Sequence, residues 1–292
     1  MSQYCGRFAP SPTGLLHFGS LLGALASYLD AKANHGKWLL RMEDLDPPRE
    51  MKGAAQAILQ SLQDHGLHWD EPVLWQSQRS TAYQQTIEQL IAQHLAFYCC
   101  CSRSDLEHYK GVYPGHCRGC NQQPAQDFAI RLQVANRQIS FSDIIQGLFS
   151  QQLEQQVGDF VLLRKDRFFA YQLAVTVDDN YQGITHVVRG SDLLDTTPRQ
   201  LFLQQQLGYR SPHYAHIPVI TNQQGQKLSK QNLARPLDSN RAGENLIAAL
   251  AFLNQPLPSK TITHDINAII LWAVEHWSIN RIPKVMSITQ SL

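Results

Sequence analysis

Hydrophobic positions along the chain fall into short runs that alternate with longer stripes. A short run before Pro10 and another over residues 37–42 predict buried β-strands. Between them, residues 20–34 are apolar on almost every side, which predicts a buried helix. Apolar stripes over 49–65 and 81–95 predict two further helices. The order strand, helix, strand, helix is typical of a parallel sheet covered by helices.

This rhythm stops near Phe97 and resumes at Tyr171. The segment between them carries most of the cysteines, and we expect it to be an α+β insertion with strands over 128–132 and 160–164. After it, the pattern predicts helices over 171–180, 197–207, 243–253 and 265–277, and strands over 186–189 and 216–220.

The chain is therefore expected to be an α/β protein with a Rossmann-type, doubly wound parallel sheet. The insertion splits this sheet, and a short, mostly helical C-terminal region follows it. The expected parts are a sheet domain from 1–95 and 171–235, an insertion over 96–170 and a C-terminal region over 236–292.

Two loops carry residue types that bind anions. Between Arg7 and Ser20, two prolines end the strand, and Gly19 with Ser20 lies near the first turn of the next helix, where free N–H groups favour an anion. His17 is presented on the same loop. Far along the chain, a glycine-containing loop carries Lys227-Leu228-Ser229-Lys230, a candidate phosphate clamp. Each motif alone is a weak signal, because short motifs match often by chance.

Composition narrows the class of protein. The chain has 292 residues, 43% hydrophobic and 17% charged, which is typical of a globular protein. No apolar run reaches the ~18 residues of a membrane span, and the first residues lack a signal peptide, so we expect a cytoplasmic protein without membrane contact. The net charge is only +1, so a nucleic-acid partner requires a local basic patch.

Five of the six cysteines lie between residues 99 and 120. In a chain without a secretion signal, such clustering indicates a metal site before disulfides. The spacing alone favours four thiolates, with Cys99 and Cys101 as C-x-C and Cys117 and Cys120 as C-x-x-C.

Taken together, the motifs resemble a known family. The H-x-G-S after the first strand and the K-L-S-K after the last one resemble the two signatures of class I aminoacyl-tRNA synthetases. The run from Arg7 to Gly19, R-F-A-P-S-P-T-G-L-L-H-F-G, is similar to the glutamyl and glutaminyl branch. Two further matches are R-M-E-D-L-D over 41–46 and H-V-V-R-G-S-D-L-L over 186–194.

After Gln231 the chain is shorter than the further anticodon-binding domain of an ordinary glutamyl-tRNA synthetase, since a domain is typically ~100–150 residues. The chain thus resembles the truncated paralogues, the glutamyl-Q tRNA(Asp) synthetases. The resemblance implies activation of L-glutamate by ATP with Mg²⁺, without tRNA, and then transfer to queuosine at the wobble position of tRNA(Asp). Basic residues of the insertion lead us to expect that it holds the anticodon stem-loop together with the C-terminal helices. We expect a monomer, because the sequence shows no clear interface stripe.

The resemblance also assigns roles to residues. Guanidinium groups match carboxylates, so arginines are expected to bind the substrate carboxylates, and an acid its ammonium group. For glutamate the residues are Arg7, Ser11, Glu43, Tyr171 and Arg189; for ATP they are His17, Gly19, Ser20, Lys227 and Lys230, of which His17 and Lys230 are catalytic. For a structural Zn²⁺ the resemblance selects Cys99, Cys101, Tyr113 and Cys117, which leaves Cys120 as a rival to Tyr113.

Three other functions stay open at this point: a glutamyl-tRNA synthetase fragment that charges the 3′ end of tRNA(Glu), an inactive zinc module that binds RNA, and a small-acid ligase outside translation. Two positions depart from the family pattern. Ser20 stands where many members have a second histidine, and Gln231 replaces the serine that closes the lysine loop.

Overall fold

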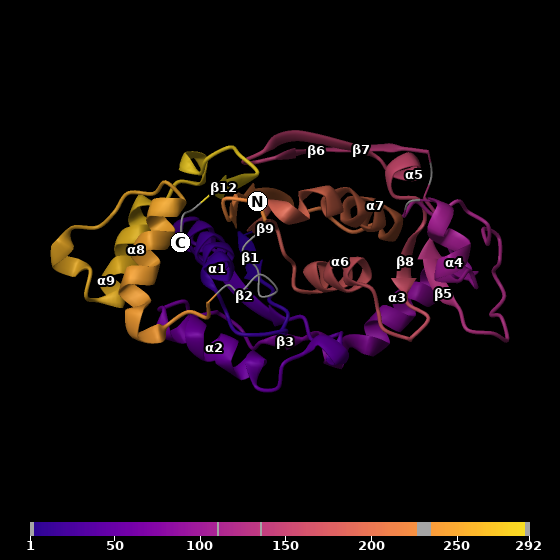
Figure 1. Cartoon of the computed structure of the whole chain (residues 1–292), viewed down its shortest axis with the longest axis horizontal. Helices are drawn as coiled ribbons and strands as arrows, with labels where there is room; N and C mark the ends of the chain where they lie inside the picture. The colour runs from indigo at the N-terminus through magenta and orange to yellow at the C-terminus, as the bar shows by residue number, and fades with distance from the viewer. Residues whose placement is uncertain (1–2, 110, 135, 227–234, 290–292) are drawn as a thin grey trace.

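The computed structural model describes residues 3–109, 111–134, 136–226 and 235–289, and parallel strands lie at its centre (Figure 1). Strand β2 (Lys37–Met42) pairs in parallel with β1 (Cys5–Phe8) on one side and with β3 (Leu74–Trp75) on the other. β2 is buried from Trp38 to Met42. Burial on both faces explains its continuous apolar run.

A second parallel pair continues this layer. Strand β9 (His186–Gly190) pairs with β10 (His213–Ile217), and its lead-in residue Thr185 donates its N–H to the Cys5 carbonyl at 2.9 Å. The Tyr4 ring stacks on His186, with centroids 3.9 Å apart. These contacts place β9 beside β1, so the carboxyl ends of both strands meet at one edge.

Helices pack around this layer. Helix α1 (Phe18–Ala33) runs through the largest core cluster, which also contains residues of β2 and of the C-terminal helices. The other helices of this part are α2 (Ala54–Asp64), α3 (Ser80–Ala92), α6 (Tyr171–Tyr181) and α7 (Thr197–Leu207).

The segment between α3 and α6 forms the end of the molecule opposite the C-terminal helices (Figure 1). Its antiparallel sheet consists of β4 (Ala96–Cys99), β5 (Ala129–Leu132) and β8 (Phe160–Leu163), accompanied by the short helices α4 (Arg103–Leu106) and α5 (Leu153–Gln156). The hairpin of β6 (Gln138–Asp143) and β7 (Gly147–Gln152) extends from this end back toward β9 and β10 (Figure 1).

At the other end, α8 (Ala242–Phe252) and α9 (Ile266–His276) pack against α1. The last strand, β12 (Ser287–Thr289), pairs in parallel with β11 (Val219–Thr221). In the described part of the chain, no helix combines the length and apolar character needed to cross a membrane.

Several helices and strands begin or end at other residues than expected, because single residues alter the backbone there. The strand expected over 216–220 is divided at Pro218, which has no N–H for the ladder. The helix expected over 49–65 begins only at Ala54, after Gly53 with φ of 81°. The helix expected over 81–95 ends at Ala92, and His94 then turns the chain with φ of 57°. The β6–β7 hairpin was not expected, although apolar and polar residues alternate along β6.

The core around α1 gives a stability prediction. Leu25 is fully buried, with 0% exposure, whereas Leu271 on α9 is 71% exposed. We expect Leu25→Ala to lower the free energy of unfolding by about 2–5 kcal/mol, because the substitution leaves a cavity. Leu271→Ala is the control, with an expected change below about 0.5 kcal/mol. Urea denaturation of both variants measures the difference, and equal effects would contradict this packing.

Candidate functional site

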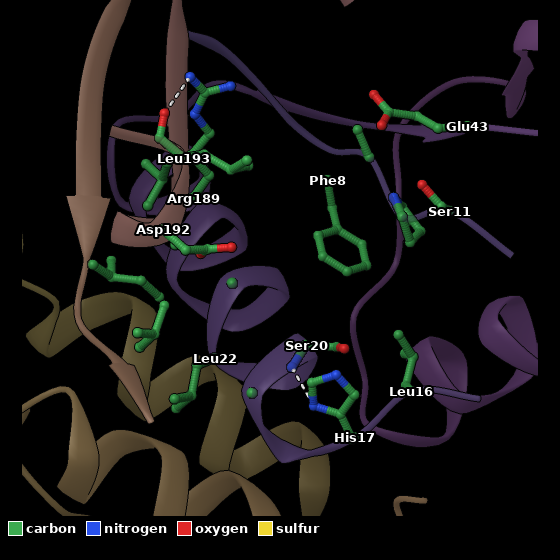
Figure 2. A pocket seen from close by; sticks show the side chains of 18 of the residues that line it. Phe8, Ser11, Leu16, His17, Ser20, Leu22, Glu43, Arg189, Asp192 and Leu193 are labelled. Carbon is green, nitrogen blue, oxygen red and sulfur yellow. Dashed lines mark hydrogen bonds between the residues drawn. The ribbon is translucent and has the colours of Figure 1, made fainter. Parts of the chain in front are cut away.

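A cavity of about 310 Å³ opens where β1 and β9 end and α1 begins. Figure 2 shows Glu43 and Ser11 on one side of it, Arg189 on the other, and His17 with Ser20 at its base. The site residues expected from the sequence that line this cavity are Arg7, Ser11, His17, Gly19, Ser20, Glu43, Tyr171 and Arg189. Lys227 and Lys230 lie outside the described residues.

Hydrogen bonds of backbone groups hold the loop after β1 in place. The Glu43 N–H donates to the Pro10 carbonyl at 2.9 Å, so the chain segments that follow β1 and β2 stay together. His17 is the N-cap of α1, and its Nδ1 accepts the Ser20 N–H at 3.3 Å (Figure 2). The neutral imidazole therefore carries its proton on Nε2. The helix begins at Phe18, two residues earlier than expected, so Gly19 and Ser20 lie in its first turn.

Buried arginines and carboxylates alternate in a hydrogen-bonded chain beneath one wall of the cavity. Asp179 on α6 accepts from Arg7 Nε at 3.2 Å and from Arg41 Nη1 at 2.8 Å. Arg41 Nη2 in turn donates to Glu43 Oε1 at 3.4 Å. Asp179 thus bridges two arginines, and Arg41 connects it to the carboxylate that faces the cavity.

This arrangement shifts two carboxyl groups in opposite directions. Burial alone would raise the pKa of Asp179, but the positive charges of Arg7 and Arg41 outweigh it and lower that pKa. Burial raises the pKa of Glu43, and Arg41 and Arg7 offset only part of that effect. Asp179 is therefore a firmly ionised counter-charge, whereas Glu43 is the more easily protonated group.

The opposite wall carries Arg189, which is only 6% exposed. Its Nε donates to His216 Nε2 at 3.0 Å, and its Nη2 donates to Thr197 Oγ1 at 2.8 Å. Further acceptors are the Tyr171 hydroxyl, 3.3 Å from Nη1, and the Leu193 carbonyl, 3.5 Å from Nη2 (Figure 2). Its hydrogen-bond acceptors in the described structure are thus all neutral, which suits a site that receives an anion.

A second cavity, of about 420 Å³, adjoins the first and shares Ser11, Glu43 and Tyr171 with it. It lies between the ends of the central strands and β8, and its wall adds charged residues and an aromatic ring. These residues are Asp46, Arg49, Arg164 and Phe169.

The cysteine cluster lies in the insertion, where β4 ends at Cys99. The sulfur atoms of Cys99, Cys101 and Cys117 lie within 4.8 Å of one another, and these residues could hold a metal ion. The Tyr113 hydroxyl is 3.3 Å from Cys99 Sγ and 3.6 Å from Cys101 Sγ. Cys120 is not part of this group in the described structure, and its sulfur contacts the Gln122 carbonyl instead.

Several residues of the site were not singled out from the sequence. Arg41 and Asp179 carry the buried charges of the first wall, and His216 with Asp143 lies behind Arg189. Two signals were present in the sequence: adjacent acids inside the apolar helix expected over 171–180, and a histidine in an apolar strand.

Asp179→Asn tests the buried charges. We expect the free energy of unfolding to fall by about 3–5 kcal/mol at neutral pH, because two buried guanidinium groups lose a counter-charge. The folded state depresses the pKa of Asp179, so its stabilisation is present above the unfolded value of about 4 and is lost as the pH falls through the folded pKa. In urea denaturation, the gap to the wild type should therefore close at acidic pH.

The control is Glu71→Gln, which removes the carboxylate partner of Lys37 in an ion pair whose side chains are 46% and 51% exposed. We expect it to cost about 0–1 kcal/mol. A similarly small effect of Asp179→Asn at neutral pH would show that the bridge does not stabilise the fold.

Comparison with known proteins identifies the fold and the family. The family described as "tRNA synthetases class I (E and Q), catalytic domain" matches residues 5–254. The glutamate-tRNA synthetase of Elizabethkingia anophelis has the same fold, with a TM-score of 0.82 over 99% of this chain and 68% of that chain, at 24% identity.

Curated relatives are similar over nearly their whole length. The glutamyl-Q tRNA(Asp) synthetase of Pseudomonas aeruginosa strain LESB58 is 49% identical over 99% of this chain and 98% of its own. That of Pseudomonas paraeruginosa strain PA7 is 50% identical over 97% of this chain and 96% of its own. The chain is therefore an aminoacyl-tRNA synthetase-like ligase with a mixed α/β class I fold, and it belongs to the glutamyl-Q tRNA(Asp) synthetase family.

Proposed function

We propose that this protein activates L-glutamate with ATP, without tRNA, and then transfers the glutamate to queuosine at the wobble position of tRNA(Asp). The observation that carries the proposal is one cavity lined by two arginines and a carboxylate, Arg7, Arg189 and Glu43. Glutamate has two carboxylates and one ammonium group, so its charges match this set.

Recognition of the acidic substrate rests mainly on Arg189. Its guanidinium hydrogen-bonds only neutral acceptors in the described structure, so its charge is available to a substrate carboxylate. Arg7 shares its charge with Asp179 and lies on the same cavity. Glu43 is proposed to hold the ammonium group, and Ser11 and Tyr171 to add hydrogen bonds. If glutamine bound in place of glutamate, one arginine would lack a carboxylate partner, so the site is expected to select against glutamine.

In the first step, a glutamate carboxylate oxygen attacks the α-phosphorus of ATP, and pyrophosphate leaves. The main requirement of such a step is the stabilisation of charge on the phosphoryl oxygens. We propose that His17 Nε2–H and the first turn of α1, at Gly19 and Ser20, meet the phosphates. Mg²⁺ bound with ATP would neutralise further charge. Lys227 and Lys230 retain the phosphate-binding role proposed from the sequence.

In the second step, a hydroxyl of queuosine attacks the acyl carbon and AMP leaves. We propose that the adjoining cavity admits the queuosine nucleoside, since it shares Glu43 and Tyr171 with the glutamate site. Its arginines, Arg49 and Arg164, suit phosphates, and the Phe169 ring suits stacking with an unpaired loop base. The anticodon stem-loop would then lie between the sheet part and the insertion. This proposal differs from the expectation that the C-terminal helices take part, because those helices lie at the opposite end of the molecule (Figure 1).

We also propose that the chain is organised as a Rossmann-type catalytic domain (1–95 and 171–235), an insertion (96–170) and a helical C-terminal region (236–292). The insertion would hold one structural Zn²⁺ through Cys99, Cys101, Cys117 and Tyr113. Around a tetrahedral zinc with bonds of ~2.3 Å, two sulfurs lie roughly 3.8 Å apart. Cys101 Sγ and Cys117 Sγ are 3.6 Å apart, which fits such a site.

The acceptor test decides the function. The protein is incubated with labelled glutamate, ATP and tRNA(Asp) that either contains or lacks queuosine. We expect label only on the queuosine-containing tRNA, and we expect it to survive removal of the 3′-terminal adenosine. Equal labelling of both tRNAs would overturn the assignment. Label that is lost with the 3′ adenosine of tRNA(Glu) would instead identify a conventional glutamyl-tRNA synthetase activity.

Cysteine substitutions test which side chains bind the proposed zinc ion. We expect Cys117→Ser to lose the bound zinc and to lower the melting temperature, because a structural site contributes folding free energy. Cys120→Ser is the matched control and should keep one zinc per chain, as measured by elemental analysis after dialysis against a chelator. If Cys120→Ser loses zinc to the same extent, the four-thiolate set suggested by the spacing is the correct one.

A further inference from the structure

The turn of the β6–β7 hairpin carries a buried carboxylate whose role the reaction does not explain. Asp143 is 4% exposed and lies at the end of β6. Its Oδ1 accepts the N–H groups of Ile145, Gln146 and His216 at 3.0, 2.8 and 3.1 Å. Its Oδ2 lies 2.6 Å from His216 Nδ1. The carboxylate thus stabilises its own turn and holds one histidine of β10 by hydrogen bonds.

His216 connects this carboxylate to the cavity. Its side chain is 0% exposed, and the parallel register places it directly beside Arg189 of β9. Arg189 Nε–H can only donate, so His216 Nε2 must accept at 3.0 Å and the ring proton must lie on Nδ1, toward Asp143. Burial lowers the pKa of His216 and Arg189 lowers it further, against the opposing effect of Asp143, so the ring is neutral at neutral pH.

The hairpin surrounds His216 with further contacts. The Phe141 ring packs at 6.4 Å from the His216 ring, and Gln146 Nε2 donates to the His216 carbonyl at 2.8 Å. The Ile144 N–H donates to the carbonyl of Tyr214, two residues earlier on β10, at 2.9 Å. The imidazole is therefore fixed in position and in tautomer by a segment that arrives from the insertion.

We infer that Asp143 and His216 are positioning residues that hold the Arg189 guanidinium toward the cavity and so set the affinity for the substrate carboxylate. This inference rests on the proposed function, since it takes glutamate as the carboxylate substrate. With Nε fixed by His216 and Nη2 by Thr197, the guanidinium plane keeps one orientation. Loss of the partners that orient a ligand-binding group typically costs about ten- to a hundredfold in affinity or activity.

Asp143→Asn separates positioning from packing, because the amide has the same shape as the carboxylate. An asparagine Nδ2 would donate to His216 Nδ1, so the ring proton would move to Nε2. Two N–H donors, of His216 and Arg189, would then face each other without an acceptor between them. We expect KM for glutamate in ATP–pyrophosphate exchange to rise about ten- to a hundredfold. KM for ATP should stay within about twofold, because the histidine touches no part of the proposed ATP site.

The double variant Asp143→Asn/His216→Gln is the rescue. A glutamine Oε1 offers an acceptor near the former Nε2 position, so KM for glutamate should return toward the wild-type value. The matched control is Asp159→Asn, which also removes a buried carboxylate, one that accepts from Val134 N–H and Arg118 in the insertion. It should lower the melting temperature without a change in KM for glutamate.

NMR of the labelled protein keeps this test independent of the enzyme assay. In the wild type, the Arg189 Nε–H should exchange slowly with water and the His216 ring should carry its proton on Nδ1; in Asp143→Asn both features should be lost. If they are lost while KM for glutamate is unchanged, or if KM for ATP rises equally, the inference is overturned. If the wild type shows no glutamate-dependent ATP–pyrophosphate exchange, the proposed function fails. Independently of that assay, unaltered NMR signals of Arg189 and His216 in Asp143→Asn would overturn this inference.

Discussion

The compensation of charge beneath the cavity is the constraint on which the rest of the site depends. Arg41 is fully buried, and a buried guanidinium is tolerated only with a counter-charge and hydrogen bonds. Asp179 provides both, and it also holds Arg7. Because one carboxylate serves two arginines, strands β1 and β2 and helix α6 must keep their relative positions. The wall that carries Arg7 and Glu43 follows from that requirement.

The two arginines of the cavity are stabilised in different ways. Arg7 has an acidic partner at its back, whereas Arg189 is held by a neutral histidine, hydroxyl groups and a carbonyl. An arginine with an acidic partner attracts a second anion less strongly than one held by neutral acceptors. Of the two arginines, Arg189 is therefore the one whose charge its own hydrogen-bond partners compensate least. Glu43 lies on the opposite side of the cavity, where the proposed function assigns it to the ammonium group of the substrate.

Much of the architecture could be predicted from the sequence, because hydrophobic periodicity reports burial of each element. The expected helices and strands exist where the stripes and runs indicated, and their ends moved where single residues such as Pro218 and His94 altered the backbone. The short parallel strands β3 and β12 were not expected. The cavity-facing residues could be found because they belong to motifs that resemble a known family and lie near the carboxyl ends of strands. The roles of Asp179, Asp143 and His216 could not be predicted, since their partners are distant in sequence. Acids in an apolar helix and a histidine in an apolar strand indicate buried polar groups but do not identify the partners.

The span between Arg7 and Asp179, 172 positions apart in the sequence, also bears on how the chain folds. Closure of so long a loop costs conformational entropy before any contact compensates for it, and chains of this size commonly pass through partly folded intermediates. The first strands and α1 can collapse around their own apolar residues as soon as they are synthesised. The arginines at their ends receive a counter-charge only after the insertion and α6 have emerged. Substrate-binding competence is therefore acquired late in folding, and an intermediate can be compact while it still lacks a binding site.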